Sequence, residues 1–228
     1  MNRLQIPLIL AFILLTGQSC NRPEIREQFY DDGTIKERIT YQDGVKHGKA
    51  EYFYENGRLQ HLFNYNEGKL QGEANKYYPI GKTESTESYQ HDILHGPSVR
   101  FDQRGRKVAE TNFSKGKHHG KHTEYWTNGE VKISGNYNNG HYHGQWKYYD
   151  QRGIRIGEGN FAEGTGMLRS WYPDGTTQRE VPYRNSKKHG VEKHYDENGE
   201  LAESYVYEDG VLVESNRVKD TDQAVKPN

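Results

Sequence analysis

The segment "GVKHGKAEYFYENG" at residues 44–57 decides the fold, because the chain repeats it in altered form along most of its length. Close versions are "GKHHGKHTEYWTNG" at 116–129, "GHYHGQWKYYDQRG" at 140–153 and "SKKHGVEKHYDENG" at 186–199. Each version combines glycines at fixed positions with aromatic residues and few aliphatic ones. A fixed internal period of this kind is the signature of a repeat protein.

The period is set by a glycine that closes a short polar turn. It recurs at Gly33, Gly57, Gly81, Gly105, Gly129, Gly153, Gly175 and Gly199. Successive members are 24 residues apart, except for one interval of 22 residues. Two residues are missing between Gly164 and Gly166 in that short interval, which predicts a deletion in a loop. The chain therefore contains eight copies of one unit, the last of them truncated.

Two further series of residues keep the same phase. An aromatic residue follows each turn glycine by eight positions, at Tyr41, Tyr65, Tyr89, Phe113, Tyr137, Phe161, Tyr183 and Tyr207. A second series of glycines lies at Gly48, Gly72, Gly96, Gly120, Gly144, Gly166 and Gly190. We expect the glycines to take the positive φ angles that tight turns require, and the aromatic rings to join one unit to the next.

Each unit is predicted to be a strand, a turn and a second strand. After the turn glycine, apolar residues alternate with polar ones, as in Ile35, Ile39 and Tyr41, which indicates a strand with one buried face. Turn sequences such as "ENG", "TNG" and "PDG" separate the strands. No window in the chain after the leader shows the apolar stripe of an amphipathic helix. The fold class predicted from the residues is all-β.

The pattern "Y-x-x-G … Y-x-x-G-x-x-x-G … Y" resembles the MORN repeat, and more closely its bacterial variant in proteins of the YwqK-type antitoxin family. The resemblance covers about residues 30–213. It implies an elongated, single-layer antiparallel sheet of about eight stacked β-hairpins of 24 residues. Because two strands advance a sheet by about 10 Å, eight units would extend over roughly 75–80 Å.

The N-terminus has the features of a secreted bacterial lipoprotein. Arg3 precedes an apolar run that is too short to span a bilayer, and the only cysteine of the chain, Cys20, stands where cleavage is expected. We therefore predict a signal peptide at residues 1–19, a lipidated Cys20 with a tether at 20–29, the repeat domain at 30–216 and a disordered tail at 217–228. A plain secretory signal with a chance cysteine is the alternative. The predicted location is the bacterial cell envelope, attached to a membrane leaflet that the sequence does not identify.

Composition excludes several classes of function. Only 32% of the residues are hydrophobic, but 18 tyrosines, 7 phenylalanines and 3 tryptophans supply apolar surface for a thin, half-wet core. The net charge is −1, from 31 basic and 32 acidic residues, so nothing in it attracts nucleic acid.

Catalytic and metal-binding motifs give no specific signal. His47, His95, His119, His143 and His189 recur once per unit. Equivalent positions in adjacent hairpins lie about 10 Å apart, too far to share one zinc ion held at about 2 Å by each ligand. The cluster His118, His119 and His122 is the remaining candidate, without an acidic or thiol partner in sequence. We expect no metal, no cofactor and no enzymatic activity.

Binding is the function that remains. Aromatic residues in phase with the repeat, such as Tyr54 and Tyr78, are expected to be structural, whereas Trp146 and Tyr142 are the candidate contacts. The first hypothesis is a non-catalytic, lipid-anchored scaffold that binds a protein in the envelope. An antitoxin or immunity-type protein, suggested by the family name, and a glycan-binding module are the alternatives. The oligomeric state stays open.

Overall fold

The computed structural model describes residues 22–217, which form one open antiparallel sheet of nineteen strands. Each strand pairs with its neighbours in sequence, except for the short strands at 69–70 and 187–188, which pair only with the strand before them. The sheet is therefore a continuous meander of hairpins. The strands are β1 Glu24–Phe29, β2 Ile35–Gln42, β3 Val45–Phe53, β4 Leu59–Asn66, β5 Lys69–Leu70, β6 Gly72–Tyr77, β7 Thr83–Gln90, β8 Ile93–Phe101, β9 Lys107–Ser114, β10 Lys117–Tyr125, β11 Val131–Asn138, β12 His141–Tyr149, β13 Arg155–Ala162, β14 Thr165–Trp171, β15 Thr177–Arg184, β16 Lys187–Lys188, β17 Gly190–Tyr195, β18 Leu201–Glu208 and β19 Val211–Arg217. The predicted all-β fold of stacked hairpins is confirmed.

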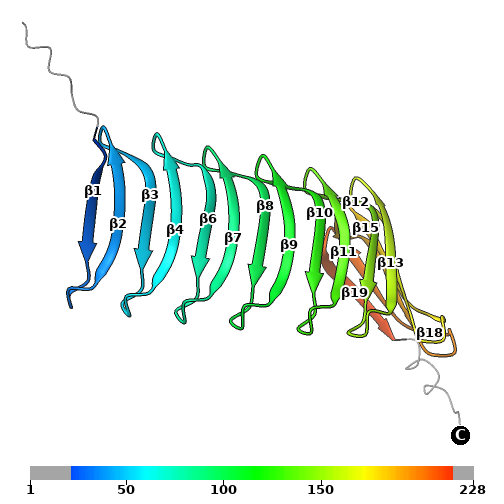
Figure 1. The fold of residues 1–228 in the computed structure, drawn as a ribbon. Coiled ribbons are helices and arrows are strands. Elements are labelled where there is room, and N and C mark those ends of the chain that lie inside the picture. Colours follow the sequence, from blue (N-terminus) through cyan, green and yellow to red (C-terminus); the bar gives the residue numbers. More distant parts are fainter. Residues whose placement is uncertain (1–21, 218–228) are drawn as a thin grey trace, which may run out of the picture.

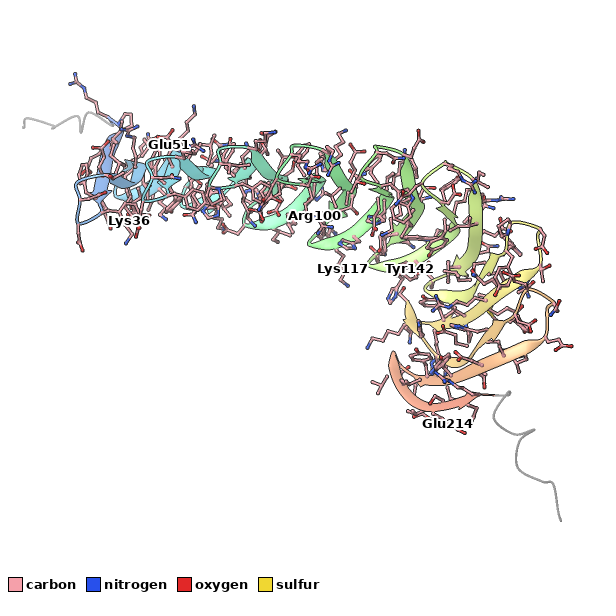
Figure 2. All side chains as sticks on the ribbon, turned by 90° about the horizontal axis from the view of Figure 1, so that it is seen from below. Lys36, Glu51, Arg100, Lys117, Tyr142 and Glu214 are labelled. Carbon is pink, nitrogen blue, oxygen red and sulfur yellow. The ribbon has the colours of Figure 1, made fainter. Side chains whose placement is uncertain are left out.

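The sheet has a straight part and a curved part. Strands β1 to β10 stand side by side in a nearly straight row (Figure 1), which we call the arm. From β11 to β19 the sheet turns away from this row (Figure 2), and we call this part the curved end. Figure 2 places Tyr142, on β12, on the inner side of the bend.

The hairpins have two kinds of turn, one at each edge of the array. The tip turns join the two strands of one unit through two residues with positive φ, such as Asp43 at 51° and Gly44 at 79°. Two successive residues of this kind define the type I′ turn, whose twist suits a hairpin. The wide turns join one unit to the next and contain the glycines of the first series. Every glycine of the first series has a positive φ.

The second series of glycines forms bulges in the strands that follow the tip turns. Gly120, for example, has a φ of 84° and lies where the pairing of β9 with β10 shifts register between His118 and His122. Positive φ also occurs at Gly48, Gly72, Gly96, Gly144 and Gly190. In two units the bulge divides the strand, which separates β5 from β6 and β16 from β17.

The short unit corrects one prediction. We expected its deletion to shorten a loop, but the tip turn is intact, with Glu163 at a φ of 47° and Gly164 at 79°. The missing residues are those of the bulge, because β13 and β14 pair without a register shift and Gly166 is not among the residues with positive φ. The deletion therefore straightens the pairing inside the hairpin.

The domain limits need a second correction. Residues 24–29, predicted to belong to a tether, form β1 and pair with β2, with Arg26 opposite Ile39. The sheet thus begins six residues earlier than the predicted limit at residue 30, and it ends at Arg217. The predicted signal peptide, Cys20 and residues 218–228 of the predicted tail lie outside the described residues.

The core lies on one face of the single layer, which is the inner face of the bend. In the arm its buried residues are small or medium-sized, and include Ile39, Ala50, Ala74 and Ala109. In the curved end the buried hydrophobic residues are Trp146, Phe161 and Val181.

Glycines within strands let the large rings of the curved end lie flat on the backbone. A Cβ atom added to Gly135 would lie 2.2 Å from the ring of Trp146. A Cβ atom on Gly159 would lie 2.5 Å from the ring of Phe161. Because no side chain at these positions separates ring from sheet, the inner face can close into a bend.

Candidate interaction site

Side chains at the wide turns link each unit to the next. The hydroxyl of Tyr54 donates to the backbone oxygen of Tyr77 at 2.7 Å. The hydroxyl of Tyr78 repeats the bond with the oxygen of Phe101 at 2.9 Å. The same bond joins Tyr30 to Phe53, the Trp126 indole to Tyr149 and Tyr172 to Tyr195. This series of bonds, which we call the ring ladder, fixes the distance between adjacent wide turns.

The ring ladder is interrupted where aspartate replaces the aromatic residue. At Asp102 the gap is bridged by another side chain, because Nη1 of Arg106 donates to the backbone oxygen of Thr127 at 2.8 Å. At Asp150 the position of Arg106 is taken by Ile154, which has no donor in its side chain. Within residues 22–217, no side-chain hydrogen bond joins the wide turn at 150–154 to the one at 172–176.

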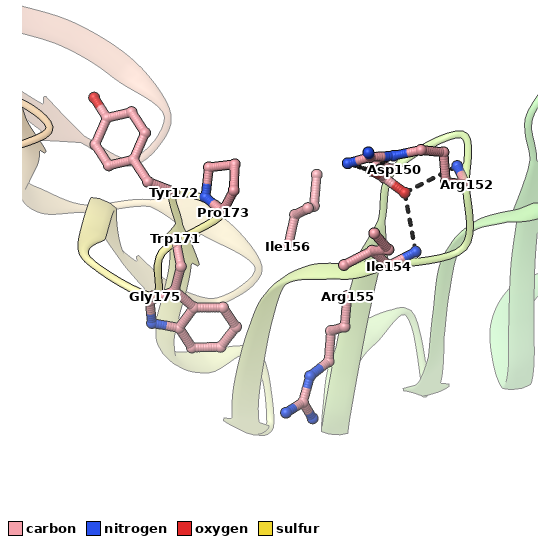
Figure 3. A pocket seen from close by; sticks show the side chains of 9 residues that line it. All are labelled: Asp150, Arg152, Ile154, Arg155, Ile156, Trp171, Tyr172, Pro173 and Gly175. Carbon is pink, nitrogen blue, oxygen red and sulfur yellow. Dashed lines mark hydrogen bonds and ion pairs between the residues drawn. The ribbon is translucent and has the colours of Figure 1, made fainter.

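A pocket of about 410 Å³ lies at this interruption. Ile154 and Ile156 come from the start of β13, while Trp171, Tyr172 and Pro173 come from the end of β14 and the following turn (Figure 3). Ile154 is 52% exposed. Asp150, Arg152, Arg155 and Gly175 complete the lining. The volume falls within the range of about 300–1,000 Å³ that is typical of ligand sites.

The carboxylate of Asp150 is engaged by its own turn. Its Oδ1 accepts hydrogen bonds from the backbone N–H groups of Ile154 and Arg152, both at 2.9 Å. Its Oδ2 accepts a bond from Nε of Arg152 at 3.0 Å. The bond from the Ile154 N–H, followed by those from Arg152, lowers the pKa of Asp150, so this carboxylate is ionised at neutral pH.

Two guanidinium groups line the pocket, and each is paired with a carboxylate, Arg152 with Asp150 and Arg155 with Glu158. Arg152 is held by Asp150, but its side chain is 73% exposed. Arg155 donates to Glu158 at 3.1 Å, and its Cζ lies 5.9 Å from the centre of the Trp171 ring. The lining contains no serine, cysteine, histidine or lysine, so it offers apolar contact and guanidinium donors instead of a nucleophile and base.

The two predicted contact residues belong to the core instead. Trp146 is only 3% exposed, and its indole donates to the backbone oxygen of Asn136 at 3.0 Å. Tyr142 packs against it with ring centres 4.6 Å apart, and against Tyr183 at 5.8 Å. The prediction that Trp146 contacts a partner is wrong, because Gly135 leaves room for its ring to sink onto the sheet. Tyr142 is half-buried and serves the same packing.

The eight repeat aromatics lie on the core face at equivalent places in β2, β4, β7, β9, β11, β13, β15 and β18. Phe161 is buried and the others are half-buried. Tyr137 contacts Trp146 with ring centres 5.0 Å apart, and burial is the main cause that raises its pKa.

The histidines are separated by the fold. His118 and His122 lie on the core face, where His118 packs between Phe113 and Tyr137 at 4.6 and 4.7 Å. His119, between them in sequence, is exposed. Burial, and then the neighbouring His122, lower the pKa of His118. Within residues 22–217, no group of three histidine, cysteine or acidic residues is placed to hold a metal ion.

A second depression of about 340 Å³ lies on the core face of the arm, over β6 to β10. Its lining includes Ser85, Ser98, Thr111 and Phe113, with Lys76 and Arg100 among the charged residues. Unit three has Ser98 here, at the position that Trp146 occupies in unit five.

Sequence reasoning missed the pocket at the interrupted ladder, although a signal for it is present. The turn sequence "DQRG" occurs at 102–105 and again at 150–153, in place of an aromatic residue such as that of "YENG" at 54–57. Only the second copy is followed by isoleucine in place of arginine. The signal is readable once the structure shows what the aromatic residue and the arginine do.

Comparison with known proteins supports the repeat. Five segments of the chain match the MORN repeat variant family. They are residues 25–43, 46–67, 119–139, 165–185 and 188–209. No curated protein matches the chain. The matched segments lie in both the arm and the curved end.

Two solved structures show a weak similarity. One is described as the crystal structure of TcdB2-TccC3-TEV, with 9% identity and a TM-score of 0.23. The alignment covers 90% of this chain but only 16% of that one. The other is a porin-like protein from Bacteroides uniformis, with 11% identity and a TM-score of 0.23, covering 85% of this chain and 93% of that one. Separately, the described residues contain no helix that could cross a membrane.

Proposed function

We propose that this protein is a non-catalytic, lipid-anchored scaffold of the bacterial cell envelope that binds another protein through its repeat sheet. MORN-variant repeats favour a binding scaffold, because a single-layer array presents long surfaces on both faces. The apolar, arginine-lined pocket between residues 150–154 and 172–176 carries the proposal. Tryptophan and arginine are enriched in interface hot spots, and here they lie beside an exposed isoleucine.

The anchor is proposed from sequence alone. Cys20 would receive the lipid after removal of residues 1–19, and the short segment before β1 would place the array close to the membrane. Growth with a labelled fatty acid tests this step. The protein should take up label, and a Cys20→Ser variant should not. Label retained by the Cys20→Ser variant would refute the anchor.

Crosslinking in intact cells tests the binding function. A tagged full-length protein is compared with Ile154→Asp, which puts a charge in the pocket, and with Ile93→Asp as the matched control. Ile93 is 49% exposed, a fraction similar to that of Ile154, but it lies far from the pocket in sequence, at the start of β8 beside a tip turn. We expect one crosslinked protein that is retained by Ile93→Asp and lost by Ile154→Asp. A capture pattern that is identical for all three proteins would refute the pocket as the binding surface.

Both the scaffold hypothesis and the antitoxin hypothesis predict a protein partner, and the identity of the captured protein distinguishes them. A toxin would establish an antitoxin or immunity role, and a structural envelope protein would establish the scaffold.

The depression on the arm favours a second candidate, glycan binding. Serine and threonine hydroxyls beside Phe113 are groups that can bond sugar hydroxyls and stack on a sugar ring. Titration with cell-wall fragments, followed by the Ser98→Leu variant, tests it. Binding that survives Ser98→Leu would exclude this depression as the site.

A further inference from the structure

We propose that the pocket between the wide turns at 150–154 and 172–176 binds a tyrosine or tryptophan side chain of the partner protein, with a carboxylate beside it. The inference rests on the proposed function, since it names the chemical feature that the scaffold recognises. Four features of the described residues support it: the repeat itself, the walls of the pocket, the indole N–H of Trp171 and the two arginines.

The repeat shows what is absent from this junction. At five other junctions a ring from the first wide turn fills the space and donates to the backbone oxygen four residues before the next turn glycine. The Asp150 side chain is too short to fill the space, and its ionised carboxylate has no hydrogen to donate. The equivalent acceptor here is the backbone oxygen of Trp171, four residues before Gly175, and no side chain of residues 22–217 donates to it. A ring from a partner, with its own O–H or N–H, would complete the ladder.

The walls suit an aromatic ring. Ile154 and Ile156 face Trp171 and Pro173 across the pocket (Figure 3). Aliphatic side chains and an indole gain most from a flat apolar group of similar thickness. The volume of about 410 Å³ leaves room for the neighbouring backbone of a bound segment.

The indole N–H of Trp171 is a free donor. The indoles of Trp126 and Trp146 bond backbone oxygens at 3.0 Å, whereas that of Trp171 bonds no atom of residues 22–217. A bound ring with a hydroxyl, or a carboxylate beside it, would supply an acceptor.

The unused guanidinium donors of the lining favour a carboxylate next to the ring. Asp150 is satisfied by its own turn, whereas Arg152 and Arg155 each use only part of their five donors. Arginine binds carboxylates with paired, charge-assisted hydrogen bonds. A carboxylate beside the inserted ring would therefore accept the donors that Arg152 and Arg155 leave unused.

The chain offers a variant that fills the pocket from within. Asp150→Tyr places the repeat's own ring at the interruption and should remove binding, at a cost in stability because the turn loses the carboxylate that accepts the N–H groups of Arg152 and Ile154. Asp102→Tyr is the matched control, because it changes the same residue of the same "DQRG" sequence at another junction. Should Asp150→Tyr fail to fold, Ile154→Arg replaces it, since it restores the bridging arginine found at position 106.

The test uses 4-hydroxyphenylacetate as the probe, because it carries a phenol and a carboxylate on one ring. Full-length protein in detergent, labelled with ¹⁵N, has three tryptophans, so the three indole N–H signals are easily followed. Trp171→Phe identifies the signal of interest. Phenylacetate, which lacks the hydroxyl, and 4-hydroxyphenylethanol, which lacks the carboxylate, are titrated in parallel.

We expect a saturable shift of the Trp171 signal with 4-hydroxyphenylacetate, and a Kd at least tenfold weaker for either analogue. Asp102→Tyr should keep the response, and Asp150→Tyr should abolish it. The proposal is overturned if the wild type shows no saturable shift, if phenylacetate binds equally well, or if Asp150→Tyr binds as the wild type does.

The outcome of the probe titration can be distinguished from the outcome of the crosslinking experiment that tests the proposed function. A partner that is lost with Ile154→Asp, together with no probe binding, would keep the scaffold and reject the aromatic ligand. Probe binding without any crosslinked protein would keep the aromatic site and reject the protein-binding scaffold.

Discussion

The arm and the curved end are built from the same repeat, but the side chains on their core faces differ in size. Position 98 of the third unit is serine and the equivalent position of the fifth is Trp146. Across from the large residue, Gly135 and Gly159 leave the backbone bare, and the sheet closes around the rings. The bulge is missing from the β13–β14 hairpin in the same region. The same repeat thus forms a straight sheet in the arm, and a curved sheet where glycines let large rings lie on the backbone.

The largest expected effect tests whether rings hold the curved end. Trp146→Ala should lower the free energy of unfolding by about 3–5 kcal/mol, because a buried ring is lost and Gly135 offers no side chain to fill the cavity. Ser98→Ala, at the equivalent place in the arm, should change it by less than about 0.5 kcal/mol. Urea unfolding followed by circular dichroism measures both. Equal losses would remove the distinction between the two parts.

The next effect concerns charge buried in the curved end. Glu192 is 2% exposed and bonds Arg179, Lys188 and His194, with His194 Nε2 at 2.7 Å. Burial would raise its pKa, but the bonds from His194 and Lys188 and the charge of Arg179 outweigh burial and lower it. At pH 7, Glu192→Gln should cost about 1–3 kcal/mol.

The pH dependence of that cost follows from the sign of the shift. A carboxyl whose folded pKa is below its ordinary value of 4.5 stabilises the fold above that pH, and the contribution is lost as the pH falls through the folded pKa. The difference between wild type and Glu192→Gln should therefore shrink below pH 4.5. Urea unfolding at pH 7 and at acid pH measures it. A difference that grows in acid would contradict the assignment.

A third prediction addresses the bulges that most units share. Gly120→Val should cost about 1–2 kcal/mol, since its φ of 84° is unfavourable for a residue with a Cβ atom, although the nearest atom would be 3.9 Å away. Lys121→Val, at the next, exposed position, is the control and should have little effect. An unchanged melting temperature for Gly120→Val would argue against a required bulge.

The smallest expected effect is on the ring ladder in the arm. Tyr54→Phe removes one hydrogen bond to Tyr77 and should cost about 1 kcal/mol. Tyr77→Phe is the control, because the Tyr77 hydroxyl makes no hydrogen bond with residues 22–217. Hydrogen exchange at the turn 78–82 should accelerate only in Tyr54→Phe. Equal exchange in both variants would show that the ladder does not fix the turns.

Much of the fold could be predicted from the chain because its determinants are local. Glycine at Gly44 and Gly120 is read directly as backbone with positive φ, and alternation around Ile39 as a strand with one buried face. The register follows, since a fixed unit length aligns each hairpin with the next. The candidate site was not predictable in this way. Trp146 and Trp171 are both tryptophans in second strands, yet one is in the core and the other lines the pocket.

The sequence by itself determined the repeat, its strands and its turns, because each depends on the conformational preferences of a few adjacent residues. Only the tertiary structure decided which rings are buried, where the sheet bends and which junction stays open. Those outcomes depend on residues in different units meeting across the sheet, as Trp146 meets Gly135, and as Ile154 leaves unbridged the gap that Arg106 spans at another junction.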